Sequence, residues 1–362
     1  MEGKRAYALI VVLWSIVILT IIFVNLIDEA ELNSLLLRNN LQRRELRSAA
    51  VDGVMRGIAS LREDETKADA GDEAWAKVRE FKPSSRISTE VKISDLGSKL
   101  NINYRSRAAF VKLAEELDWA EIDWKELSTK LVWERDVENE EEKLGLISNL
   151  ALLREEFESK ADYQQTKELF TTYGCFNPNL YQAEAAVQLL YFLKEKLDLT
   201  TLSQALILDI GAEVSQGEHK GYDSVQGFLE EALPTSPYLR EKIAPYLTVK
   251  PRININFVSA EVLALILSNR EEAGSDYKKR AEKIVTYCRE HRVKNLDQLN
   301  KIGVGIISPQ LKGYLTTSSS YLLITVRALN QKTGQEEEIE AVVHKRWEDE
   351  ESKVQIIDWR EE

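Results

Sequence analysis

The sequence has few of the residues on which disulfide scaffolds and metal enzymes depend. Only two cysteines, Cys175 and Cys288, occur among 362 residues. So few cysteines exclude a disulfide-stapled fold, although one bridge between the two stays open if the chain is exported. The three histidines, His219, His291 and His344, are scattered and match no metal-ligand spacing. The chain also lacks a glycine-rich phosphate loop and a nucleophile elbow, so we expect no enzymatic activity.

Positive charge is in the minority. The chain has 48 Lys and Arg against 60 Asp and Glu, which gives a formal net charge of -12. This balance disfavours non-specific binding to nucleic acid or anionic lipid through the surface as a whole. The acidic run Asp136, Glu138, Glu140, Glu141 and Glu142 could hold calcium, which prefers oxygen ligands, with Asp136, Glu138 and Glu140 as the candidate ligands. The run lacks the spacing of a calcium site, however, and we favour its interpretation as a solvated helical face.

No proline occurs before Pro83, so nothing in the first eighty residues forces a helix to end. The 22 residues from Ala6 to Ile27 carry no charge. As a helix they would extend about 33 Å, enough to cross a bilayer core of roughly 30 Å. Apolar residues then recur at helical spacing as far as Leu61. The sequence predicts one helix over 7–61, transmembrane in its first half and amphipathic in its second.

Strand patterns lie on both sides of a long helical stretch. The segment "RISTEVKISD", within residues 62–104, alternates apolar and polar residues, as do "YLLITVRALN", "EEEIEAVVHKRW" and "KVQIIDW" within residues 318–362. Residues 105–317 show mainly helical spacing. The sequence therefore predicts an α+β fold, in which the N-terminal helix packs on an antiparallel sheet that a large all-α insertion interrupts.

One phrase occurs twice, as "LNINYRSRAAF" from Leu100 and as "ININFVSAEVLALIL" from Ile253. The repetition predicts two related helical units in tandem, of the helix-hairpin-helix or SAM-like kind. Ser259 is a natural N-cap for the helix that follows the second phrase. The asparagines of both phrases are expected to bond to backbone where the chain turns from strand to helix. They are Asn101, Asn103, Asn254 and Asn256.

The segment "KRAYALIVVLWSIVIL" resembles the start of type IV prepilins and pseudopilins. This resemblance implies a leader over residues 1–6 that a prepilin peptidase removes between Ala6 and Tyr7. It also implies a helix that packs in the membrane and in a filament through Tyr7, Leu9, Val11, Leu13, Trp14, Ile18 and Phe23. Val11 stands where most pilins carry an acidic residue. An unpaired carboxylate in lipid costs several kcal/mol, and a tip subunit has no neighbour above it, so Val11 suits the tip.

Three longer segments are similar to the general secretion pathway protein K family, the large minor pseudopilins of type II secretion systems. They are "ISDLGSKLNIN", "APYLTVKPRININFVSAEVLALIL" and "YLLITVRALNQKTGQEEEIEAVVHKR". The resemblance implies a pseudopilus tip subunit that helps to start pseudopilus assembly and protein secretion across the outer membrane. The implied partners are minor pseudopilins I and J, the major pseudopilin, the prepilin peptidase, inner-membrane lipid and secreted substrates. A related type IV pilus system stays open.

The location follows from the charges that flank the apolar run. Lys4 and Arg5 precede it, and the positive-inside rule keeps such an end in the cytoplasm. We therefore expect the bulk of the protein to be extracytoplasmic, and the resemblance implies a single-pass inner-membrane protein whose bulk is periplasmic.

The main alternative is a membrane-anchored DNA-binding protein of the competence type. Gly303 and Gly305 resemble a helix-hairpin-helix turn whose backbone N–H groups contact phosphate. Only Lys301 and Lys312 flank this turn, and Asp297 offsets one of them, so counterion release would be small. We therefore expect no nucleic-acid partner.

Overall fold

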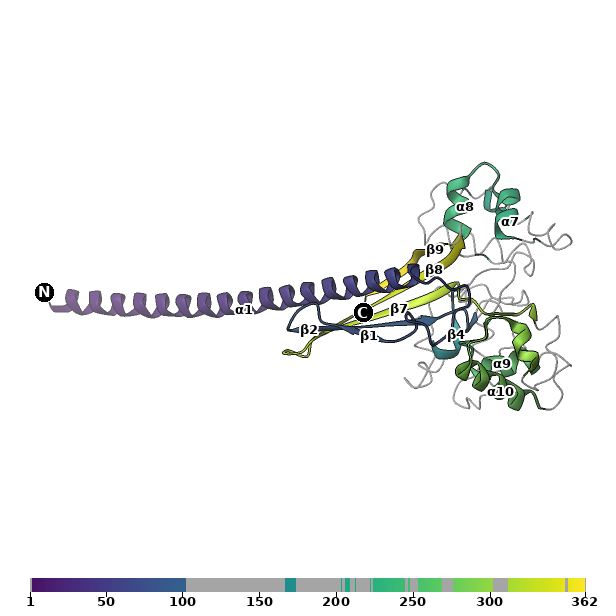
Figure 1. The fold of residues 1–362 in the computed structure, drawn as a ribbon. Coiled ribbons are helices and arrows are strands. Elements are labelled where there is room, and N and C mark those ends of the chain that lie inside the picture. The colour runs from purple at the N-terminus through teal and green to yellow at the C-terminus, as the bar shows by residue number, and fades with distance from the viewer. Residues whose placement is uncertain are drawn as a thin grey trace, which may run out of the picture.

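The computed structural model describes residues 2–101, 167–173, 203, 206–208, 212, 222, 224–244, 247, 253–268, 276–301, 312–348 and 351–361. Within these residues the chain forms one long helix, a five-stranded sheet and a group of shorter helices (Figure 1). The α+β prediction is confirmed.

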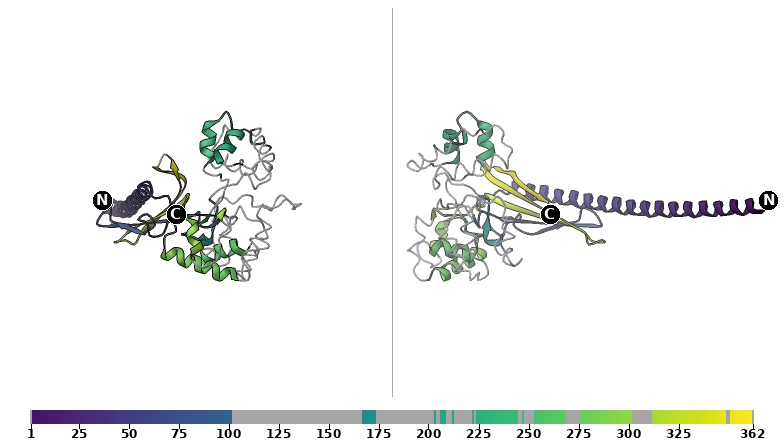
Figure 2. Two further views of the ribbon diagram at one scale, coloured as in Figure 1. Left: turned by 45° about the vertical axis from the view of Figure 1, so that its right-hand side comes forward. Right: turned by 180° about the vertical axis from the view of Figure 1, so that it is seen from behind.

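Helix α1 (Glu2–Arg62) is a single continuous helix that begins within the proposed leader. Its C-terminal part lies on the sheet, and its N-terminal part extends away from the rest of the chain without a neighbouring element (Figures 1 and 2). No glycine-proline pair or internal proline interrupts it. The molecule is therefore a head on a long helical stem.

The sheet has the strand order β1-β2-β7-β8-β9, and all neighbouring strands are antiparallel. Its strands are β1 (Arg79–Phe81), β2 (Ile87–Asp95), β7 (Tyr321–Asn330), β8 (Glu336–Glu348) and β9 (Glu351–Glu361). All nine residues of β2 are paired with β7, from Ile87 opposite Asn330 to Asp95 opposite Leu322. Residues 96–320 therefore leave the sheet and return to it between two neighbouring strands.

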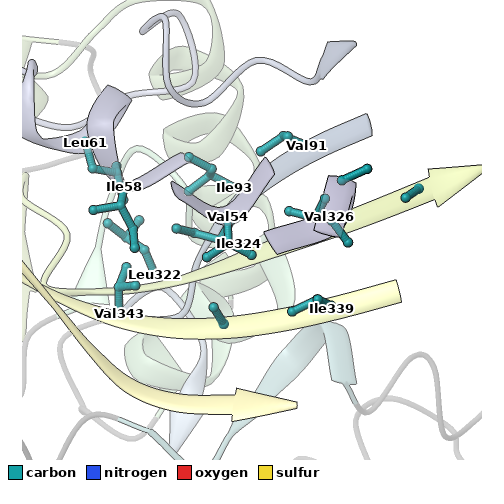
Figure 3. Packing of buried hydrophobic residues seen from close by; sticks show 14 of the residues in the cluster. Val54, Ile58, Leu61, Val91, Ile93, Leu322, Ile324, Val326, Ile339 and Val343 are labelled. Carbon is teal, nitrogen blue, oxygen red and sulfur yellow. The ribbon is translucent and has the colours of Figure 1, made fainter. Parts of the chain in front are cut away.

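The core lies between α1 and one face of the sheet (Figure 3). Alternate residues of each strand point to this face, as the period of two requires. On α1 the buried residues recur at steps of three or four, which is the spacing of one helical face. The fully or almost fully buried members include Leu46, Ala50, Val54, Leu61, Leu322, Ile324, Val326, Ile339 and Val343.

Two glycines allow α1 to approach the sheet closely. A Cβ atom on Gly53 would lie 2.5 Å from Val326 Cγ1, and one on Gly57 would lie 2.9 Å from Ile324 Cγ2. Distances this short require the strand or the helix to shift. The absence of a side chain at these two positions therefore sets the distance between helix and sheet.

The described part of the insertion is mainly helical. It contains α7 (Val225–Ala232), α8 (Pro237–Ile243), α9 (Ala260–Ser268), α10 (Tyr277–Glu290) and the 3-10 helix η5 (Leu296–Lys301). Helices α7 and α8 lie apart from α9 and α10, and both pairs lie at the end of the head opposite the N-terminus (Figures 1 and 2).

The insertion differs from the all-α prediction in two places. Strand β3 (Leu100–Asn101) pairs in parallel with β4 (Phe170–Thr171), and β5 (Ile253–Asn254) pairs in parallel with β6 (Leu315–Thr316). Each of the two repeated phrases opens with one of these strands. Two paired residues are too short for a periodic signal, so only the pairing partner reveals them.

The cysteine bridge that the sequence left open is not formed. Cys288 lies buried on α10 as a free thiol, and burial raises its pKa to about 12. A thiol of this kind is protonated at neutral pH and serves as a small apolar residue.

We predict that Gly53→Ala lowers the free energy of unfolding by about 1 kcal/mol, although alanine is the better helix former by a similar amount. The added methyl group would have to displace Val326 on β7. Denaturant unfolding of the detergent-solubilised chain measures the change. Ser48→Ala is the matched control, because Ser48 is exposed on the same helix and should gain a few tenths of a kcal/mol. A stabilising Gly53→Ala would show that the helix and sheet are not in tight contact.

Candidate functional site

The stem of α1 exposes an unusual amount of apolar surface. Trp14 is 62% exposed and Phe23 is 66% exposed. The other exposed large apolar residues of the described stem are Leu19, Ile21, Ile22, Val24, Leu26, Ile27, Leu32, Leu35, Leu36, Leu37 and Leu41. The first residue of α1 that is buried in the described core is Leu46. The head of this chain therefore leaves this surface uncovered.

Several residues predicted for the stem fall outside the described side chains. These are Ala6 and Tyr7 at the predicted cleavage site, together with Leu9, Val11, Leu13 and Ile18. Among the residues that the structure describes, no helix is both long enough and apolar enough to span a bilayer.

A second feature is a buried group of polar side chains where three parts of the chain meet. These parts are the segment between α1 and β1, residues 63–78, which we call the connector, the insertion around α9 and α10, and the sheet. We call the group the polar junction, and it consists of Asp64, Asp69, Glu73, Asn254, Asn256, Arg292, Ser319 and Lys345. A buried polar group of this kind contributes to stability only when its members satisfy one another.

Lys345 provides the central cation of the polar junction. Its Nζ atom lies 2.5 Å from Asp64 Oδ2 and 2.6 Å from Asp69 Oδ1, and its side chain is fully buried. Nζ also lies 5.6 Å from the centre of the Trp75 ring. The second carboxylate oxygen of Asp69 accepts a hydrogen bond of 2.6 Å from the Ser319 N–H. One ammonium group thus holds two carboxylates of the connector against β8.

Burial and pairing act in opposite directions on these ionisable groups. Burial lowers the pKa of Lys345, but its attraction to Asp69 and Asp64 outweighs this and the pKa rises overall. Burial also disfavours the charged form of Asp64, but hydrogen bonds from Lys345 and Thr66 outweigh it and lower the pKa. For Asp69 burial dominates and raises the pKa to about 6. At neutral pH Lys345, Asp64 and Asp69 are therefore all charged.

Arg292 connects the end of α10 to the same connector. Its guanidinium donates to Glu73 Oε1, to the Ala68 carbonyl and, at 2.7 Å, to Thr66 Oγ1. The other oxygen of Glu73 accepts a hydrogen bond of 2.6 Å from Trp75 Nε1. Glu73 is almost fully buried, so loss of Arg292 would leave a carboxylate without its ion-pair partner.

The two asparagines of the second phrase bond to parts of the chain that are distant in sequence. The Asn254 amide donates to the Asp69 carbonyl at 3.3 Å and to Ser319 Oγ at 2.8 Å. The Asn256 amide donates to the same carbonyl at 3.0 Å and to the Val293 carbonyl at 3.0 Å. Asn256 Oδ1 in turn accepts the Val293 N–H at 3.1 Å. Both side chains therefore attach the insertion to the connector.

The remaining motif residues divide into two groups. Ser259 Oγ accepts the Val262 N–H at 3.2 Å, which is the bond of an N-cap to α9. Asn103 and the side chain of Asn101 lie outside the described residues. The two hairpin glycines, Gly303 and Gly305, also lie outside them.

The polar junction brings together three carboxylates that could hold a metal ion by spacing alone. Oxygen atoms of Asp64, Asp69 and Glu73 all lie within 4.8 Å of one another. This set does not fit a cation such as calcium, because Lys345 and Arg292 already supply the positive charge. The predicted candidates Asp136, Glu138 and Glu140 lie outside the described residues.

Sequence reasoning missed Asp69, Arg292 and Lys345. A signal for Lys345 is present, because it continues the alternation of Ile339, Ala341 and Val343 on the core-facing side of β8. A lysine in phase with buried residues predicts a buried carboxylate partner. The identity of that partner depends on the path of the connector, which has no periodic pattern.

Comparisons with known proteins find similarity to solved structures but none in sequence. No family model matches the chain, and no curated protein matches it in sequence. A search of solved structures finds a chain in the crystal structure of the GspK-GspI-GspJ complex from the enterotoxigenic Escherichia coli type 2 secretion system. The two chains are 14% identical, with a TM-score of 0.42, and the match covers 90% of this chain and 98% of the other.

We predict that Lys345→Met lowers the free energy of unfolding by about 3 to 5 kcal/mol, because two buried carboxylates lose their cation. Without Lys345 the pKa values of Asp64 and Asp69 should both lie above their unfolded values. The folded state would then bind more protons, so the loss should grow as the pH rises from 5 to 8.

The control for this experiment is the triple variant Lys345→Met, Asp64→Asn, Asp69→Asn. It removes all three charges and should be more stable than Lys345→Met alone at pH 8. Denaturant unfolding at both pH values compares the two. An equal loss for Lys345→Met at pH 5 and pH 8 would contradict an ionic role.

We predict that Asn256→Ala loosens the segment that follows α10, because the Val293 N–H loses its acceptor. Its amide hydrogen exchange should accelerate about tenfold, as expected for one buried hydrogen bond worth about 1 to 2 kcal/mol. Asn295→Ala is the control, since Asn295 is exposed and its side chain accepts the Asp297 N–H within its own turn. If both variants leave exchange at Val293 unchanged, Asn256 does not hold the segment that follows α10.

Proposed function

We propose that the chain is a non-enzymatic minor pseudopilin at the tip of a type II secretion pseudopilus. One observation carries the proposal: a single helix packs one half on an antiparallel sheet and projects the other half, with exposed apolar side chains, away from the head (Figure 1). A helix that is apolar on all sides needs lipid or other helices around it. Pilin-like subunits meet this need by packing their stem helices in the membrane and against the stems of neighbouring subunits.

The membrane arrangement is part of this proposal. Residues 7–27 would span the inner membrane with the N-terminus in the cytoplasm, as the charges of Lys4 and Arg5 indicate. The prepilin peptidase would cut between Ala6 and Tyr7. Everything after the apolar run, including the sheet and the insertion, would then lie in the periplasm.

The position of the insertion supports a place at the tip. Helices α7 to α10 lie at the end of the head that is farthest from the N-terminus (Figure 1). In a filament whose stems run parallel, this end points away from the membrane. Material added there leaves the sides of the stem free for neighbours but obstructs a subunit stacked above. Val11, in place of a carboxylate, fits the same position.

The polar junction supports a structural role over a catalytic one. Its charged groups are buried and bond to one another, with Lys345 held by two carboxylates and Arg292 by Glu73. We propose that it fixes the insertion rigidly on the sheet so that the head presents one shape to its partners. Those partners would be minor pseudopilins I and J, the major pseudopilin and passing secreted substrates.

We predict that the full chain, purified in detergent after co-expression, retains the minor pseudopilins I and J of its own secretion system. The same preparation should not shift duplex DNA on a gel, because Lys312 next to the predicted hairpin is already paired with Asp297. A DNA shift without any retained pilin would favour the competence-type alternative and reject the tip proposal.

We also predict that the purified chain begins at Tyr7. Its intact mass measures the cleavage site directly, and a chain that keeps residues 1–6 would reject the cut before Tyr7.

A further inference from the structure

Three leucines continue the sheet-facing side of α1 beyond the end of the sheet. They are Leu32, Leu35 and Leu36, which are 58%, 63% and 53% exposed. Each leucine lies 18 residues, or about five helical turns, before a second residue on the same face of the helix. These second residues are, in the same order, Ala50, Gly53 and Val54. Those three residues are buried against the sheet. The three leucines, which we call the leucine patch, therefore lie on a face built to pack but left uncovered by this chain.

Carboxylates surround the membrane-proximal end of the leucine patch. Asp28, Glu29 and Glu31 form what we call the acidic collar, and all three are exposed. None of them forms an ion pair within the described part of the chain. No lysine or arginine occurs between Arg5 and Arg38, so the collar has no basic neighbour on its own helix.

The acidic collar excludes lipid as the cover of the leucine patch. Carboxylates inside the hydrocarbon region are strongly unfavourable, so the collar must lie at or beyond the membrane surface. The patch follows the collar on the side away from the proposed span. A cover for the leucines must therefore be protein.

The negative charge of the acidic collar also determines which kind of protein can cover the leucine patch. Stems anchored in the same membrane run parallel, so a second copy placed side by side would bring two collars against each other. Like charges opposed across an interface weaken binding and reject that partner. A different stem with Lys or Arg at this level would form ion pairs while its apolar residues cover the leucines.

We propose that the leucine patch and the acidic collar are the docking site for the stem helix of a different pilin-like subunit that carries basic residues opposite the collar. The collar at the same time prevents a second copy of this chain from taking that place. The inference rests on the proposed function, and it explains how such a subunit would enter an assembly only once.

The test uses the full chain in membranes, co-expressed with the minor pseudopilins I and J of its own system. A photoreactive benzoylphenylalanine replaces Leu35 at the centre of the patch. Irradiation should give an adduct with one of the two partners and none between two copies of this chain. The double variant Asp28→Lys, Glu31→Lys should lower the adduct yield about tenfold, because it places like charges across the interface.

The matched control is Glu63→Lys, Glu65→Lys, which makes the same change of charge at exposed positions just beyond the other end of α1. It should leave the adduct yield unchanged. Three outcomes would each overturn the inference and leave the proposed function standing. They are an adduct between two copies of this chain, an adduct yield that does not change in the collar variant, and no adduct although the partners still co-purify. Failure of both partners to co-purify would reject the proposed function and this inference with it.

Discussion

The buried ammonium group of Lys345 is the point on which the architecture of the head depends. It comes from β8, next to the edge strand β9, and its two carboxylate partners come from the connector that follows α1. Asp69 also connects the connector to the insertion, because its backbone carbonyl accepts hydrogen bonds from both Asn254 and Asn256. The order of contacts runs from sheet to connector to insertion. Apolar packing forms the core, but this chain of polar contacts sets where the insertion lies.

The cost of such an arrangement explains its location. Burying three charges is unfavourable unless every one is paired and hydrogen-bonded. A purely apolar contact could have been stronger, but it would tolerate sliding, whereas directional bonds allow one orientation. The polar junction therefore favours one orientation of the insertion on the sheet over the strongest possible contact.

The elements with a long period were predictable from the sequence. Helix α1 repeats its pattern over many turns, and β2, β7 and β8 alternate over nine or more residues. Strand β1 was not predicted, because its three residues lie in a polar connector. The two-residue strands β3 to β6 could not be predicted either, since each exists only through its partner.

The site was predictable only in part, for a related reason. Asn254 and Asn256 stand out in the sequence because their phrase recurs, but their bonds reach a carbonyl almost two hundred residues earlier. Asp69 sits among many acidic residues of a connector, and nothing local separates it from Asp72 or Glu65. A contact between segments far apart in sequence leaves a trace in each segment only when the residue breaks a local pattern. Lys345 does so within β8, and Asp69 does not.

The interrupted sheet also has a consequence for the order in which the chain folds. Strands β7, β8 and β9 follow one another closely and can form a three-stranded meander as soon as the C-terminus is available. Strand β2 can pair only after its partner β7, which lies more than two hundred residues later in the chain, has been synthesised. Until then α1 has no sheet to cover its apolar face, and such non-local pairing is slow. A chain of this design therefore spends its first moments with both its stem and its future core exposed to other proteins.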